Sequence, residues 1–153
     1  MEHPWQGYIP ELLEASIVVT ASIARWAYDN RQAVGVLANG SLPDSDRPIS
    51  ISPSRAPDQL PRLLEALGGI MPMTVEPLAD LLERESHRLP LGSTLAVVTT
   101  LLTEPLAAVL RRLREEGQQV SVLSMVDDDW SDILGGVPVQ RIRYDASQAE
   151  ATP

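Results

Sequence analysis

Three short, continuous apolar segments constrain the fold of this chain most strongly. They cover residues 33–38, 94–100 and 119–125. Each is too short for a typical helix and is bounded by turn residues, so each is predicted to be a strand that is buried on both faces. Segments with helical periodicity lie between them. Buried strands that alternate with amphipathic helices predict an α/β fold with a mostly parallel sheet and right-handed crossovers.

The first expected element is a helix over Pro10–Asp29. Proline suits the first turn of a helix, because the N–H that it lacks would have no partner there. This segment is apolar around most of its girth, which predicts heavy burial. An α/β fold usually begins with a strand against which its first helix packs, and no strand precedes this one.

The other expected elements are shorter. Ile49 and Ile51 alternate with serines after Pro48, which predicts an edge strand over 48–52 followed by a turn at 53–57. Gly117 is expected just beyond a helix C-terminus, and a final strand is predicted over 137–143. Three further helices are predicted after capping residues: 59–67 after Asp58, 75–86 after Thr74, and one that starts at 104 after Thr103.

Composition excludes several classes of function. The chain has 153 residues with 12 basic and 21 acidic side chains, a net charge of -9. This balance argues against nucleic-acid binding, which needs clustered Lys and Arg. There is no cysteine and there are two histidines, so thiol catalysis and thiolate zinc sites are excluded. No segment in the sequence is predicted to span a membrane, because the apolar run 17–24 is far too short.

Catalytic motifs are also missing from the sequence. Neither a glycine-rich phosphate loop nor a G-x-S-x-G elbow occurs. His3 and His87 are far apart, and His87 suits the C-terminal end of a helix. The glycine pairs 68–69 and 135–136 are expected at helix exits or turns with positive φ. Arg111, Arg112 and Arg114 are predicted to form a solvated helix face with Glu115 and Glu116.

Polar residues follow two of the expected parallel strands. Thr99 and Thr100 end one, and Asp127 and Asp128 follow the next. Ligands of open α/β sheets bind outside the carboxyl ends of the strands. The acidic run 127–129, around Trp130, could hold a divalent cation, although adjacent carboxylates diverge and a solvated loop is favoured. Thr103, together with at least one of Thr99 and Thr100, is expected to cap the helix that follows.

The order of segments resembles the domain-of-unknown-function family 58, prokaryotic proteins with a von Willebrand factor A-like domain. The resemblance covers about residues 5–143 and rests on three stretches: Glu11–Gly40, Pro53–Leu67 and Leu89–Leu123. It implies a Rossmann-like sheet in which the Asn39-Gly40 turn leads to an antiparallel edge strand. It also implies that Met1 lies just after the first strand of the family, so that the domain is incomplete at its N-terminus.

The resemblance further implies a von Willebrand A-like domain over 10–144. The composition of the flanking segments predicts an irregular lead-in over 1–9 and a flexible tail over 145–153. Family members are often encoded beside MoxR-type AAA ATPases and often carry membrane helices upstream. The expected function is therefore a non-enzymatic adaptor for such an ATPase in the cytoplasm, with a possible tether to the membrane through upstream segments. The alternative is a small-molecule or nucleotide-binding enzyme on a Rossmann-like sheet.

The expected contact residues, for a ligand or a partner, lie at strand ends: Asn39, Thr99, Thr100, Asp127 and Asp128. No cofactor and no functional metal are expected. Metal-binding von Willebrand A-like domains carry an Asp-x-Ser-x-Ser motif, which this sequence lacks, and an Asp where the resemblance places a threonine at the end of 94–100. Neutral hydroxyls do not offset the cost of dehydrating a hard cation.

Overall fold

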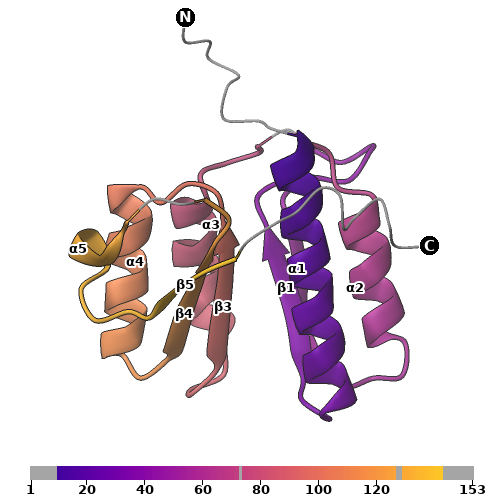
Figure 1. Cartoon of the computed structure of the whole chain (residues 1–153). Coiled ribbons are helices and arrows are strands. Elements are labelled where there is room, and N and C mark those ends of the chain that lie inside the picture. The colour runs from indigo at the N-terminus through magenta and orange to yellow at the C-terminus, as the bar shows by residue number, and fades with distance from the viewer. Residues whose placement is uncertain (1–9, 73, 127–128, 143–153) are drawn as a thin grey trace, which may run out of the picture. The chain divides into compact units, whose positions relative to one another are not determined.

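A computed structural model describes residues 10–72, 74–126 and 129–142 (Figure 1). The chain forms two compact units. We call residues 17–88 the antiparallel unit. We call residues 89–142, with residues 10–16 at the start of the first helix, the parallel unit.

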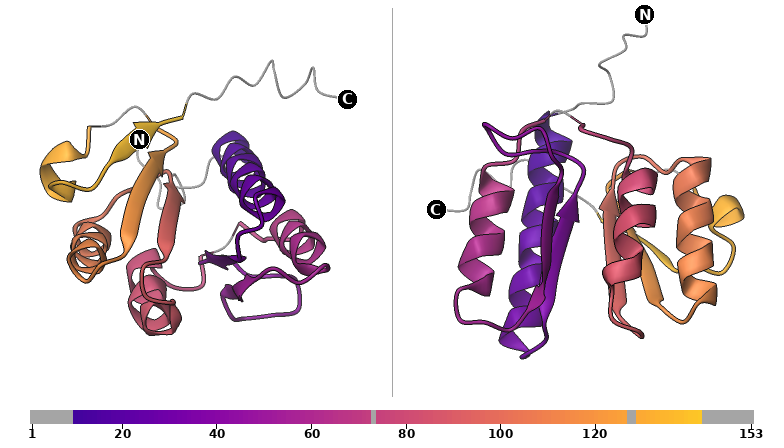
Figure 2. Two further views of the ribbon diagram at one scale, coloured as in Figure 1. Left: turned by 90° about the horizontal axis from the view of Figure 1, so that it is seen from below. Right: turned by 180° about the vertical axis from the view of Figure 1, so that it is seen from behind.

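The antiparallel unit contains most of α1 (Pro10–Asp29), a pair of strands and two further helices. The strands are β1 (Val34–Ala38) and β2 (Ile49–Ser54), which pair antiparallel with a bulge between Val34 and Val36. Helix α2 (Gln59–Gly68) lies beside α1, as Figure 2 shows. Ala24 of α1 and Leu60 and Leu63 of α2 form a small buried core with the half-buried side chains of Val34, Val36 and Ile51.

Helix α3 (Leu78–Glu85) packs on the other face of the β1–β2 pair. Successive side chains of a strand point to opposite faces, so Ser50 faces away from the core beside Ile51. The Ser50 hydroxyl donates a hydrogen bond to Glu85 Oε1 at 2.7 Å. Helix α3 continues directly into the 3-10 turn η2 (Ser86–Arg88). This contact joins the end of α3 to the edge strand.

The parallel unit holds a three-stranded sheet in the order β3-β4-β5. Its strands are β3 (Thr94–Thr99), β4 (Gln119–Ser124) and β5 (Val139–Arg141), all parallel to their neighbours. Helix α4 (Glu104–Glu115) connects β3 to β4, and the short α5 (Ser131–Leu134) precedes β5. Figure 2 shows α4 along one face of this sheet.

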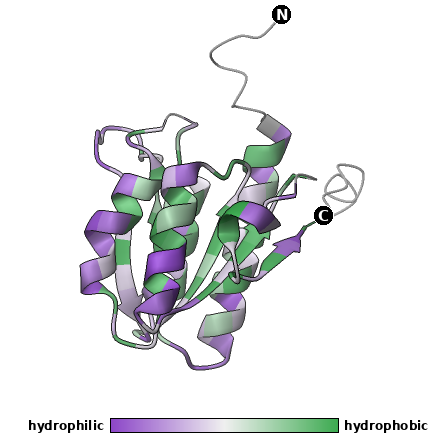
Figure 3. Cartoon of the chain, turned by 90° about the vertical axis from the view of Figure 1, so that its left-hand side faces the viewer, coloured by the Kyte–Doolittle hydropathy of each residue, from purple (hydrophilic) through white to green (hydrophobic). Residues whose placement is uncertain are grey.

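Helix α4 has the ends that the sequence predicts. Thr103 Oγ1 accepts a hydrogen bond from the Leu106 N–H at 3.3 Å, as an N-cap does. Gly117 has φ +104°, the left-handed conformation expected just beyond a helix. Three leucines of α4, Leu106, Leu110 and Leu113, are almost completely buried. Figure 3 shows hydrophilic residues on the helices of this unit and mainly hydrophobic ones on the strands.

Only one face of the parallel sheet is well buried. Val97 pairs with Val122 in the register, and both are buried on the same face. The opposite face carries exposed or half-buried side chains: Thr94, Ala96, Val98, Gln119, Ser121 and Leu123. The expectation that 94–100 and 119–125 are buried on both faces is therefore wrong. Residues 33–38 are also less buried than expected, because every residue of β1 is intermediate.

Helix α1 is much less buried than expected. Of its described residues only Ala15, Ala24 and Ala27 are buried, whereas Val18 is 57% and Trp26 61% exposed. Apolar residues around most of the helix surface predicted heavy burial. The elements that pack on α1 cover only a narrow stripe of that surface. Burial depends on the surface available elsewhere in the fold, which helical periodicity does not report.

Several boundaries also differ from expectation. Helix α3 starts at Leu78 rather than 75, since Pro77 has φ -58° and ψ 141° and so lies outside the helix. Strand β2 runs through Pro53 instead of ending in a turn there. Asp58 makes no side-chain capping bond to α2. Of the glycines 68, 69, 135 and 136, only Gly135 has a positive φ.

The fold is therefore α/β, as predicted, with a parallel sheet and an antiparallel pair. The antiparallel pairing of β2 with β1, after the Asn39-Gly40 turn, is also as expected. The strands form two separate sheets rather than one mostly parallel sheet. The predicted lead-in, 1–9, and tail, 145–153, lie outside the described residues.

Candidate functional site

The carboxyl ends of β3 and β4 carry two hydroxyl groups with matching geometry. Thr99 and Ser124 are register partners. Thr99 Oγ1 donates to the Leu101 carbonyl at 2.8 Å and accepts from the Leu101 N–H at 3.2 Å. Ser124 Oγ makes the same two bonds with Val126, at 2.8 and 3.3 Å. Both hydroxyls thus shape the loops after their strands, and Thr99 does not cap α4.

The other expected strand-end residues are placed apart from this pair. Thr100 follows Thr99 and is half-buried. Asn39 belongs to the antiparallel unit, where its carbonyl accepts from the Val75 N–H at 2.7 Å. Asp127 and Asp128 lie outside the described residues. The structure therefore brings Thr99 together with Ser124, a residue that sequence reasoning missed, and describes no site that unites the five.

Asp129 is the described carboxylate of the acidic loop. Its Oδ1 accepts hydrogen bonds from the Ser131 hydroxyl at 2.7 Å and from the Ser131 N–H at 3.0 Å. These bonds, the hydroxyl first, stabilise the ionised form and lower the pKa of Asp129, and the charge of Arg141 adds to the effect. The carboxylate therefore fixes the start of α5.

We expect the pKa of Asp129, measured by NMR titration, to lie below the ordinary value for aspartate. Replacing Ser131 by alanine should raise it, because the hydroxyl donor is lost. A folded pKa below the unfolded one means that the ionised carboxylate stabilises the fold above the unfolded pKa, and that this contribution is lost as the pH falls through the folded pKa. Ser121→Ala, in β4, is the control. An unchanged pKa in Ser131→Ala would contradict the assignment.

Strand β3 has an open edge. Within the parallel ladder the Gln119 N–H donates to the Ser93 carbonyl and the Met125 N–H to the Thr99 carbonyl. Odd-numbered residues of β3 therefore bond to β4. Because backbone groups alternate in direction, the N–H and C=O groups of Thr94, Ala96 and Val98 point away from β4. Among the described residues β3 pairs with β4 only.

This edge lacks the protection that natural edge strands usually carry. Proteins blunt open edges with charged residues, prolines or bulges. The sequence of β3 is TLAVVT, which has none of these, and its pairing with β4 is regular. The edge of β2, in contrast, contains Pro53, and β1 is bulged. Strand β3 is therefore suited to pair with another strand.

Two buried polar side chains of the antiparallel unit have structural roles. Gln59 is fully buried, and its Nε2 donates to the carbonyls of Val34 and Ser52 at 2.7 and 2.9 Å. Glu85 is 7% exposed and receives the Ser50 hydroxyl, with Arg84 at 3.7 Å and Arg88 at 3.6 Å. Neither was singled out by the sequence analysis, because a polar residue in a helix gives no sign of its distant partners.

The exposed side of α3 carries a further ion pair. The Arg84 guanidinium donates two hydrogen bonds to the Glu76 carboxylate. These bonds lower the pKa of Glu76 and raise that of Arg84. Exposed pairs of this kind contribute little to stability. The arrangement holds the segment before α3 against the helix.

The described residues also bear on metal binding and on membrane spanning. Within residues 10–72, 74–126 and 129–142, no three His, Asp or Glu side chains cluster in a way that could hold a metal ion. Because Asp127 and Asp128 are not among those residues, the expectation of no functional metal stays a prediction. Among the described helices, none combines the length and the apolar character needed to cross a membrane.

Comparison with known proteins gives no assignment. No protein-family model matches the chain, and no curated protein matches it either. The resemblance to family 58 therefore stays a prediction.

Proposed function

We propose that this chain is a non-enzymatic protein-interaction module with a Rossmann-like, von Willebrand factor A-like fold, and that it acts as an adaptor for a MoxR-type AAA ATPase. The observation that carries the interaction role is the open edge of β3. The choice of partner comes from the resemblance of residues 5–143 to family 58.

The open edge supports binding by strand addition. An extended segment of a partner can pair with an exposed sheet edge, where main-chain hydrogen bonds give affinity. Thr94, Ala96 and Val98 offer three successive sets of outward backbone groups. Their side chains lie on the less buried face of the sheet, where a bound strand would extend the surface.

Helix α1 supports a second, apolar contact. Trp26 is 61% and Val18 57% exposed on the part of α1 that belongs to the antiparallel unit. Aromatic residues are enriched at protein interfaces, since their large area is desolvated on binding. Exposed aliphatic and aromatic side chains on a helix with few buried residues fit a docking role better than a purely structural one.

Binding of the purified ATPase to the purified chain, measured by calorimetry, tests the proposal. Ala96→Pro removes an N–H that faces away from β4, and should weaken binding by up to about tenfold, the range for one lost hydrogen bond. Ala96→Ser keeps the N–H and is the matched control. Far-UV circular dichroism verifies that both variants fold.

If the unmodified chain does not bind the ATPase, the proposed adaptor role is wrong. If folded Ala96→Pro binds the ATPase as tightly as the unmodified chain does, the edge of β3 is not the contact surface. The same chain, heated with a panel of nucleotides, tests the alternative. A ligand that binds the folded state raises the melting temperature, so a rise would favour a nucleotide-binding enzyme instead.

A further inference from the structure

The ladder between β4 and β5 stops halfway along β4. The Val122 N–H donates to the Pro138 carbonyl, and the Ile142 N–H to the Ser124 carbonyl. Even-numbered residues of β4 therefore face β5. Val120 comes next in this series, but β5 pairs only with residues 122–124. The N–H and C=O of Val120 point into the space beyond the end of the ladder.

Proline explains why the ladder stops there. Continuing the pattern would require the N–H of residue 138 to donate to the Val120 carbonyl. Pro138 has no N–H. The first half of β4 therefore presents an unpaired edge beside the start of β5, while its other edge is paired with β3.

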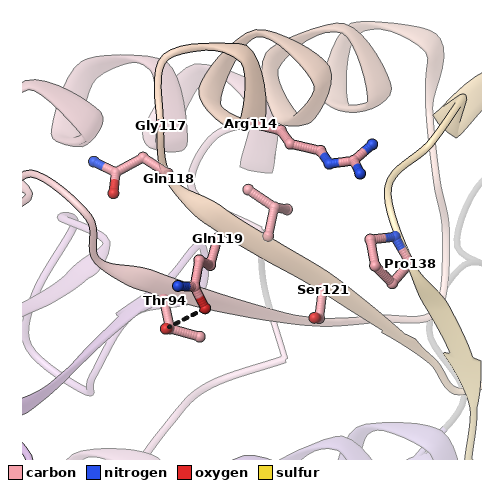
Figure 4. A pocket seen from close by; sticks show the side chains of 8 residues that line it. Thr94, Arg114, Gly117, Gln118, Gln119, Ser121 and Pro138 are labelled. Atoms are coloured by element: carbon pink, nitrogen blue, oxygen red, sulfur yellow. Dashed lines mark hydrogen bonds between the residues drawn. The ribbon is translucent and has the colours of Figure 1, made fainter.

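A pocket of about 420 Å³ lies at this place (Figure 4). Its walls include Arg114, Gln118, Val120 and Pro138. Figure 4 shows Arg114 reaching from the end of α4 toward Pro138. The Arg114 guanidinium lies against Gly136, and its side chain makes no hydrogen bond or ion pair with the described residues. On the same helix Arg112 pairs with Glu116 at 3.0 Å, as expected, and Arg111 lies 3.9 Å from Glu104.

A buried acceptor lies in the wall of the pocket. Gln118 is 9% exposed, and its Nε2 donates weakly to the Pro90 carbonyl at 3.4 Å. Its Oε1 is buried and has no hydrogen-bond partner among the described residues. A buried polar atom without a partner costs free energy unless a ligand or water supplies a donor. The pocket therefore offers a cation and a backbone donor and acceptor, while the unpaired amide oxygen of Gln118 is buried in its wall.

We infer that this pocket binds an extended peptide segment that carries a carboxylate. Guanidinium groups pair with carboxylates in a planar, two-bonded geometry. The outward N–H and C=O of Val120 pair with the backbone of an extended chain, as in strand addition. In the bound peptide, the carboxylate pairs with the Arg114 guanidinium. The adjoining peptide unit forms hydrogen bonds with the backbone of Val120. This site lies on the β5 side of β4 and is independent of the open edge of β3 and of the proposed function.

Three acetylated tripeptides test the inference and separate two sources of the carboxylate. The first is acetyl-alanyl-valyl-alanine with a free C-terminus, the second is its C-terminal amide, and the third is acetyl-alanyl-valyl-aspartic acid amide. Each is titrated into the full chain to millimolar concentration and followed by two-dimensional NMR. Binding should shift the Val120 amide, the Arg114 Nε–H and the Gln118 side-chain amide, and the first peptide should bind more tightly than the second. Binding by the third identifies a side-chain carboxylate as an alternative source.

The decisive variant is Arg114→Gln, which removes the charge from an exposed position. We expect binding to weaken about 10- to 100-fold, the range for a lost charge-assisted hydrogen bond. Arg114→Lys keeps the charge and should retain part of the affinity. Arg25→Gln, an exposed arginine of α1, is the matched control and should bind as the unmodified chain does. The NMR spectra themselves report whether each variant is folded.

The inference is overturned if neither carboxylate peptide shifts the Val120 and Arg114 signals. It is also overturned if the neutral amide binds as tightly as the free acid, or if folded Arg114→Gln binds with unchanged affinity. In those cases the pocket holds only water.

Discussion

Replacing Gly35 by alanine should destabilise the antiparallel unit by about 3 kcal/mol or more, at the upper end of the range for overpacking. Gly35 lies at the bulge of β1, and a Cβ there would lie 2.6 Å from the Pro53 nitrogen and 2.8 Å from the Ser52 carbonyl carbon, with the Ile51 oxygen still closer. All three are backbone atoms of the partner strand. They cannot move aside as a side chain could, so the two strands must separate.

Gly68→Ala is the matched control and should have the opposite sign. Gly68 is the last residue of α2, and a Cβ there meets nothing within 4 Å. Alanine in a helix is favoured over glycine by about 0.5–1 kcal/mol. Urea unfolding followed by far-UV circular dichroism compares both variants with the unmodified chain. Equal stability of Gly35→Ala and the unmodified chain would show that β1 and β2 do not approach as described.

Gln59→Leu should lower the free energy of unfolding by about 2–5 kcal/mol, because two buried carbonyls lose their donor. The Gln59 amide bonds both Val34 and Ser52, so one side chain joins the start of α2 to β1 and to β2. Leucine has a similar volume and leaves little cavity. The loss therefore measures the hydrogen bonds rather than packing.

Gln32→Leu makes the same change at an exposed position and should leave stability nearly unaltered. Gln59→Glu sharpens the test. An ionised glutamate would direct oxygen toward two carbonyls, so this variant should be less stable than Gln59→Leu at neutral pH. Its stability should recover partly on acidification, when the protonated carboxyl can donate one hydrogen bond. If Gln59→Leu proves as stable as Gln32→Leu, the bridging role is wrong.

Local signals predicted local structure well. The cap at Thr103, the left-handed Gly117 and the parallel strand–helix–strand unit from β3 to β4 follow from residues close together in the sequence. The α/β class follows from the alternation of such units. Even the antiparallel β2 could be predicted from Ile49 and Ile51 after a proline, although it continues past Pro53.

Properties that depend on distant partners were not predictable in the same way. The exposure of Trp26 depends on what packs on α1, and the carbonyls that need Gln59 come from two strands. The strand-end site was only partly predictable. The pattern placed Thr99 at the end of its strand, but its register partner Ser124 became visible only when the two strands were paired.

Parallel pairing also determines when, during synthesis, the backbone edges of β3 become covered by a partner strand. Thr94 pairs with Gln119, so β3 has no partner until roughly two dozen further residues, including α4, have been made, since parallel strands need a long crossover. At about 5–20 residues per second, this interval lasts on the order of seconds. Throughout it, TLAVVT exposes both of its edges. A newly made chain is therefore most open to capture by chaperones, or by a neighbouring nascent chain, before β4 leaves the ribosome.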